Sequence, residues 1–124
     1  MAKWSSEQLE AIVEADDLKV APYRDDGVTP GTPTWIWCVA VEGGLYVRAY
    51  HGVSSRWHVA ATREAAGEII AAGETHDVVF AVAADHLSPA IDDAYRAKYA
   101  GSPYLAHMVG KTSCNATVLI SPKD

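Results

Sequence analysis

The stretch TWIWCVAVEGGLYVRAYH, residues 34–51, holds two runs rich in β-branched and aromatic residues on either side of Gly43-Gly44. Runs of this composition are typical of strands, and a Gly-Gly pair between them predicts a two-residue hairpin turn. That turn fixes the cross-strand pairs, which are Val41 with Tyr46, Val39 with Arg48, and Trp37 with Tyr50.

Alternation divides this hairpin into two faces, and neither is polar. One face is small and aliphatic: Ile36, Cys38, Ala40, Leu45, Val47 and Ala49. The other face is aromatic and aliphatic with one cation: Trp35, Trp37, Val39, Val41, Tyr46, Arg48 and Tyr50. A hairpin that is apolar on both sides predicts a barrel or sandwich wall whose outer side is covered by a helix, a ligand or a partner chain.

The elements expected around the hairpin are mostly strands. Capping-box spacing at Ser5 and Gln8 opens a helix over 6–15, and Ser88-Pro89 opens another that ends at Gly101. Ser54 or Ser55 caps a helix over 56–66, and Ser102-Pro103 opens a short one that ends at Gly110. The remaining expected strands are 18–23, 67–73, 75–83 and 116–121, with a loop over 24–33. This order predicts one α+β domain over 1–124, a six-stranded β-barrel with short flanking helices.

Composition excludes several classes of protein. Ten Lys and Arg against sixteen Asp and Glu give a net charge of −6, which disfavours nucleic-acid binding. No apolar run is long enough to span a membrane, and the start MAKWSSEQLE lacks the pattern of a signal peptide. Cys38 and Cys114 have no disulfide-type spacing. We therefore expect a cytoplasmic protein with reduced thiols.

The chain carries none of the common catalytic signatures, such as HExxH, GxSxG, a Walker loop or GxGxxG. Its five histidines are scattered, so no metal centre is predicted. A cofactor-free enzyme that uses His51 or His58 as general base remains an alternative.

Residues 43–63 contain no Asp or Glu but include Arg48, Arg56 and Arg63. Arg48 lies on a face expected to be buried, where an unpaired cation is costly, so it needs an acidic partner or an anionic ligand. Ser54, Ser55 and the amides of the next helix are suitable donors for a phosphate or carboxylate. Four aromatic side chains could stack on a planar ring: Trp35, Trp37, Tyr50 and Trp57. The alternative is that these aromatics form core or a dimer interface, and that Arg48 pairs with an acid.

Four segments together resemble a known superfamily: GGLYVRAYHGVSSRWHVAA (43–61), THDVVFAVA (75–83), IDDAYRAKYAG (91–101) and ATVLISP (116–122). They resemble the split β-barrel flavin-binding proteins, which are pyridoxamine-phosphate-oxidase-like. The nearest branch is the small deazaflavin-dependent nitroreductase-like proteins, and within it the chain is similar to an uncharacterised bacterial group classed as a domain of unknown function.

The resemblance implies a site. The loop that would hold the cofactor phosphate is His51, Gly52, Val53, Ser54 and Ser55, with Arg56 and Trp57 opening the next helix and Arg48 on the strand before it. The residues that would border the substrate pocket are Tyr95, Tyr99 and Tyr104. A homodimer with two sites at its interface is also implied, and Trp35, Trp37, Val39 and Val41 would form an outward apolar surface for it.

The function implied is an oxidoreductase that transfers hydride from reduced FMN or deazaflavin to a small electrophilic substrate. Members of that branch carry cations in a Gly-rich loop, whereas GVTPGTP, residues 27–33, has none. Losing two charge-assisted hydrogen bonds weakens binding by at least about a hundredfold, so micromolar affinity is expected. The alternative from another class is a non-catalytic barrel module that binds a small anion or no ligand. If Arg48 binds the ligand, Arg48→Met should abolish anion or cofactor binding and leave the fold largely intact, whereas an unfolded variant of a protein that binds no anion would indicate a structural ion pair.

Overall fold

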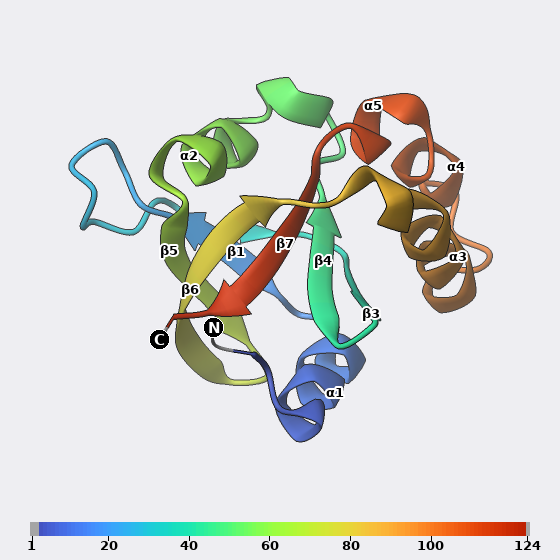
Figure 1. The fold of residues 1–124 in the computed structure, drawn as a ribbon, viewed down its shortest axis with the longest axis horizontal. Coiled ribbons are helices and arrows are strands. Elements are labelled where there is room, and N and C mark those ends of the chain that lie inside the picture. The colour runs from blue at the N-terminus through green and yellow to red at the C-terminus, as the bar shows by residue number, and fades with distance from the viewer. Residues whose placement is uncertain (1–2, 124) are drawn as a thin grey trace.

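Seven antiparallel strands form one curled sheet in the computed structural model, which describes residues 3–123 (Figure 1). The strands are β1 Lys19–Pro22, β2 Thr34–Trp35, β3 Cys38–Val41, β4 Gly44–Arg48, β5 Ala66–Ala71, β6 Glu74–Val82 and β7 Thr117–Pro122. Their order in the sheet is β2-β1-β5-β6-β7-β4-β3. The two edge strands, β2 and β3, are therefore consecutive in the chain. Because residues 36–37 alone join them and can span only about 10 Å, the sheet must curl into a half-barrel.

The helices are α1 Ser6–Ala15, α2 Arg56–Glu64, α3 Ser88–Lys98, α4 Leu105–Met108 and α5 Lys111–Cys114. The expected capping box of α1 is confirmed: the N–H of Gln8 donates to Ser5 Oγ and the N–H of Ser5 donates to Gln8 Oε1, both at 3.0 Å. The expected helix over 102–110 is shorter than predicted, and α5 was not expected. Among residues 3–123, no helix has both the length and the hydropathy needed to cross a membrane.

The structure has seven strands where the sequence predicts six, because the run 34–42 is two strands. Trp35 pairs with Lys19 in β1, whereas Cys38 pairs with Val47 in β4. The N–H of Ile36 donates to the carbonyl of Leu18 at 3.1 Å, and the chain then leaves β1. An unbroken apolar alternation cannot reveal such a change of partner, because both halves keep a strand conformation.

The hairpin turn is Glu42-Gly43 and not Gly43-Gly44. Both residues have positive φ, 50° and 80°, which is the geometry of a type I′ turn. The observed pairs are Cys38 with Val47, Val39 with Tyr46, Ala40 with Leu45 and Val41 with Gly44. The predicted register is therefore wrong by two residues, but a shift of two leaves every side chain on its predicted face.

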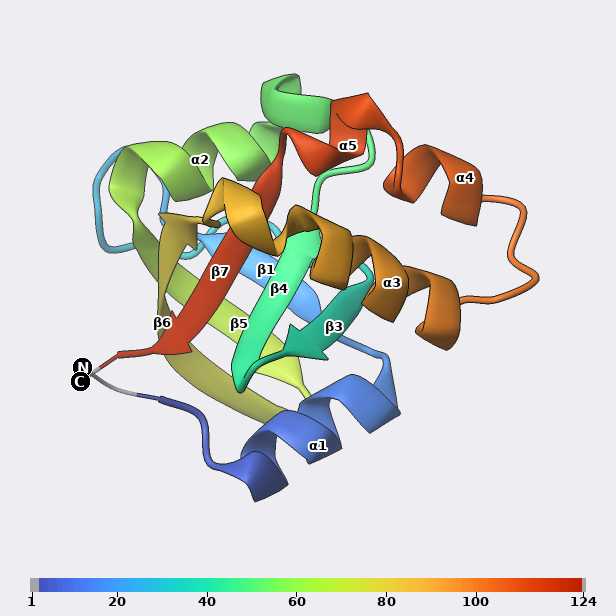
Figure 2. The same ribbon diagram turned by 45° about the vertical axis from the view of Figure 1, so that its right-hand side comes forward.

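Both faces of the hairpin strands β3 and β4 are buried apart from Ala40, as the sequence predicts. The aliphatic face lies inside the half-barrel with α1 residues such as Leu9 and Ile12. The other face lies under α3, which crosses the outer side of β3 and β4 in Figure 2. Val39 and Val41 are therefore covered by a helix of their own chain and do not form the outward surface expected for a dimer.

Candidate functional site

A cavity of about 500 Å³ opens where the edge strands β2 and β3 part. Its volume lies within the range of small-molecule sites. Residues 34–37 form one wall, and the start of α2 contributes Ser55, Arg56 and Trp57. The remaining lining residues lie at the end of β4, just after it, or in the region of α4: Arg48, Tyr50, His51, Tyr104 and Met108.

The cavity brings together most of the residues that the sequence and the resemblance assign to cofactor binding: Trp35, Trp37, Arg48, Tyr50, His51, Ser55, Arg56 and Trp57. Gly52 and Ser54 are not among its lining residues. Gly52 instead has a φ of +81° and packs so closely on Thr112 that a Cβ would lie 2.8 Å from its Cγ2. Thr34, Ile36 and Met108 were missed. The first two flank the predicted tryptophans, whereas nothing in the sequence distinguishes Met108.

Of the three tyrosines expected to border a substrate pocket, only Tyr104 lines the cavity. Tyr95 and Tyr99 lie in the buried cluster under α3. Tyr99 stacks on Trp37 with ring centroids 3.9 Å apart, and its hydroxyl donates to Asp16 Oδ1 at 2.6 Å. Burial and this hydrogen bond raise the pKa of Tyr99 well above its usual value, so the hydroxyl remains a donor. Tyr99 therefore fixes the indole that forms the cavity wall.

The facing wall is held in the same way. Tyr50 stacks on His107 with centroids 4.1 Å apart, and Tyr104 meets the Tyr50 ring edge-on at 6.1 Å. His107 Nε2 lies 2.6 Å from the carbonyl oxygen of Tyr50, which also accepts from Ser113 Oγ at 3.2 Å. The segment after β4 is thus tied to α4 and α5, and the cavity has a prepared aromatic rim.

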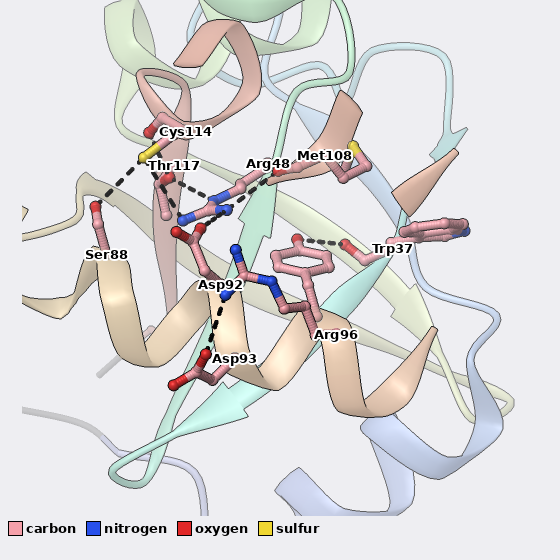
Figure 3. Close-up of polar contacts among 10 residues, drawn as sticks. Trp37, Arg48, Ser88, Asp92, Asp93, Arg96, Met108, Cys114 and Thr117 are labelled. Atoms are coloured by element: carbon pink, nitrogen blue, oxygen red, sulfur yellow. Dashed lines mark hydrogen bonds and ion pairs between the residues drawn. The ribbon is translucent and has the colours of Figure 1, made fainter. Parts of the chain in front are cut away.

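Arg48 has an acidic partner. Its side chain is fully covered, and its Nη1 donates to Asp92 Oδ1 of α3 at 2.5 Å (Figure 3). Its other donors also point at protein atoms: Thr117 Oγ1 at 3.0 Å, the Met108 carbonyl at 3.1 Å and Cys114 Sγ at 3.8 Å. The guanidinium lies over the ring of Tyr95, 5.3 Å from its centroid. Of the two partners that the sequence leaves open for Arg48, an acid or an anionic ligand, the structure shows the acid, and the guanidinium is surrounded by protein atoms.

Polar groups remain available where α2 begins. Ser55 is the N-cap residue, but its side chain makes no capping hydrogen bond, contrary to expectation. Arg56 is exposed and takes part in no ion pair among residues 3–123. With His51, these residues place hydrogen-bond donors beside the aromatic walls.

The two histidines considered as a general base differ in position. His51 lines the cavity, whereas His58 is buried on α2 and does not line it. Burial lowers the pKa of His58 below its usual value, so the buried ring is neutral at pH 7. Within the part of the chain that the structure describes, no group of His, Cys, Asp and Glu side chains could hold a metal ion.

The family model described as "Uncharacterized protein conserved in bacteria (DUF2255)" matches residues 8–120, which is most of the chain. A search of curated proteins found no match.

Proposed function

We propose that this chain, which belongs to the DUF2255 family of bacterial proteins, binds a flavin or a deazaflavin in the cavity between residues 34–37 and α2. The bound cofactor would transfer hydride to a small electrophilic substrate. The observation that carries the proposal is the convergence of three tryptophans and two tyrosines on one cavity: Trp35, Trp37, Trp57, Tyr50 and Tyr104.

The donor set fits such a ligand. A planar ring needs flat apolar walls, and the rings of Trp37 and Tyr50 are each held by a stacked neighbour. An anionic substituent needs donors, and Arg56, Ser55 and His51 supply them at one side of the cavity. The redox chemistry belongs to the cofactor, whereas these residues bind it, orient it and exclude water from its ring.

The second candidate function is a non-catalytic module that binds a small anion in the same cavity. The loop over 27–33, which carries no cation, favours it because fewer charged groups are available to hold a cofactor tail. A cofactor-free enzyme would have to use His51, since His58 does not reach the cavity.

Titration of the purified protein with FMN and with a deazaflavin tests the proposal. We expect a colourless preparation whose tryptophan fluorescence is quenched on addition of either compound, with a micromolar Kd. Quenching is expected because three of the tryptophans line the cavity, whereas Trp4 lies in the core and donates to the Ile120 carbonyl. Absence of quenching by both compounds at about 1 mM, roughly a thousandfold above that Kd range, would overturn the oxidoreductase proposal.

A matched pair of variants assigns the site. Trp35 is 54% exposed at the rim, and Trp35→Leu should weaken flavin binding several-fold, because an aromatic contact is worth about 0.5–1.5 kcal/mol beyond its area. Val82 is 73% exposed and does not line the cavity, so Val82→Ala should bind as the wild type does. Equal losses in the two variants would place the ligand elsewhere.

We also propose that the protein is a homodimer, but the surface that supports this differs from the one that the sequence suggested. Val39 and Val41 are covered by α3, but Trp35, Tyr50 and Tyr104 remain exposed around the cavity mouth, where a second copy could cover them. Sedimentation should therefore give twice the 13.3 kDa mass of one chain. A 13.3 kDa particle at micromolar concentration would contradict this proposal.

A further inference from the structure

We propose that the anionic tail of the ligand leaves the aromatic cavity at Arg56 and lies in a second cavity, where it is bound by Arg56, Arg63 and Arg24. This inference rests on the proposed function and adds to it a phosphate-binding site. The site is formed mainly by a face of α2 and by the segment that follows β1, not by Arg48 or by residues 51–54.

The second cavity has a volume of about 430 Å³ and adjoins the first. The two share Thr34, Arg56 and Trp57 as lining residues, so a ligand could extend from one into the other past these side chains. On α2 the second cavity is lined further by Ala60 and Arg63. Arg56, Ala60 and Arg63 are four and three residues apart, which places them on one side of the helix with a small residue between two cations.

The side chains around this cavity favour an anion. Three arginines line it, and Asp25 is the acidic residue that lines it with them. Arg63 Nε donates to Glu64 Oε2 at 2.7 Å, and its Nη2 lies 3.5 Å from the Tyr23 carbonyl, so Nη1 remains for a ligand. Arg56 takes part in no ion pair among residues 3–123. In a chain with net charge −6, this is a local concentration of positive charge.

Hydrogen bonds to Asp26 hold the loop on the other side of the cavity. Asp26 accepts hydrogen bonds from the N–H groups of Val28 at 2.9 Å and Thr29 at 2.8 Å, and from the Thr29 hydroxyl. These hydrogen bonds lower the pKa of Asp26 to about 2, and the bond from the Thr29 hydroxyl is the largest cause. The Asp26 carboxylate therefore accepts hydrogen bonds within the loop, and Asp26 is not among the residues that line the cavity. Asp26 thus leaves Arg56 and Nη1 of Arg63 available for a ligand.

The chemistry that fits is a phosphate ester carried on a flexible chain. A guanidinium can bind two phosphate oxygens at once, and two guanidiniums on one helix face can hold a dianion between them. A neutral ligand with the same ring would gain nothing from this cavity.

The test compares FMN with riboflavin, which has the same ring and no phosphate. The wild type should bind FMN at least tenfold more tightly, because each charge-assisted hydrogen bond contributes about that factor. Arg63→Met should remove most of this preference and leave riboflavin binding unchanged, since Arg63 does not line the aromatic cavity. Arg63→Lys should retain part of it. The matched control is Arg96→Met, because Arg96 is an exposed arginine of α3 that pairs with Asp93 (Figure 3).

The outcomes separate this inference from the proposed function. If the wild type binds riboflavin and FMN equally, or if Arg63→Met and Arg56→Met keep the preference for FMN, the second cavity is not the phosphate site, and the aromatic cavity stands. If neither flavin binds to the wild type, both proposals fail. Circular dichroism spectra of the variants should match the wild type, since Arg56 and Arg63 are exposed.

Discussion

Arg48→Met should lower the free energy of unfolding by about 3–5 kcal/mol, because it leaves the Asp92 carboxylate without its partner in a largely buried site. The change also removes the hydrogen bonds that Arg48 donates to Thr117 Oγ1 and to the Met108 carbonyl. Since Asp92 lies in α3, Thr117 in β7 and Met108 in α4, Arg48 joins β4 to three other parts of the fold. The sequence alone led to the opposite expectation, namely lost binding with an intact fold.

Urea denaturation monitored by circular dichroism measures this effect. Arg96→Met, which removes an exposed arginine from α3, should change the free energy of unfolding by no more than about 0.5 kcal/mol. The double variant Arg48→Met/Asp92→Leu should be more stable than Arg48→Met, because it no longer leaves a buried charge unpaired. An Arg48→Met protein that has the wild-type midpoint of urea denaturation but does not bind flavin would show instead that Arg48 binds the ligand.

Gly67→Val should destabilise the protein by at least about 3 kcal/mol, the upper end of the usual cost of overpacking. A Cβ at Gly67 would lie 2.6 Å from Pro22 Cα and 2.7 Å from the Ala21 carbonyl oxygen, both of them backbone atoms of β1. Neither can move unless β1 separates from β5. Because β2 is the edge strand that pairs with β1, that separation would also displace Thr34 and Trp35 from the cavity wall.

The neighbouring residue provides the control. Glu68→Val introduces the same side chain one position along β5, where Glu68 is half-buried and pairs with Asp77. It should alter stability by no more than about 0.5 kcal/mol. Chemical denaturation of the two variants, with flavin titration of any folded fraction, measures both effects. A Gly67→Val protein as stable as Glu68→Val would mean that β1 and β5 tolerate a wider spacing.

Much of the candidate site is already evident in the sequence, because its residues are close together in the chain. The lining residues from Thr34 to Trp57 fall in one stretch of the chain that is rich in aromatic residues, and the part of it after Glu42 has cations and no acid. Alternation assigned the hairpin faces correctly even though the turn was misplaced, since side-chain direction repeats every two residues. Tyr95 and Tyr99, which the resemblance assigned to a substrate pocket, do not line this cavity, and the sequence could not show this because a helix face indicates which residues are buried and not what they are buried against.

Sequence by itself determined the properties that depend on neighbouring residues: the α1 capping box, the double burial of the hairpin, and the helix that begins at Ser88-Pro89. Tertiary structure alone decided how distant segments meet. Asp92 lies 44 positions from the arginine that it pairs with, and Thr117 lies 69 positions from it. The break of the run 34–42 into two strands likewise depends on β1 and β4, because its first half pairs with β1 and its second half pairs with β4. Local patterns carry no information about such partners, because each contact depends on where the rest of the chain brings a second group.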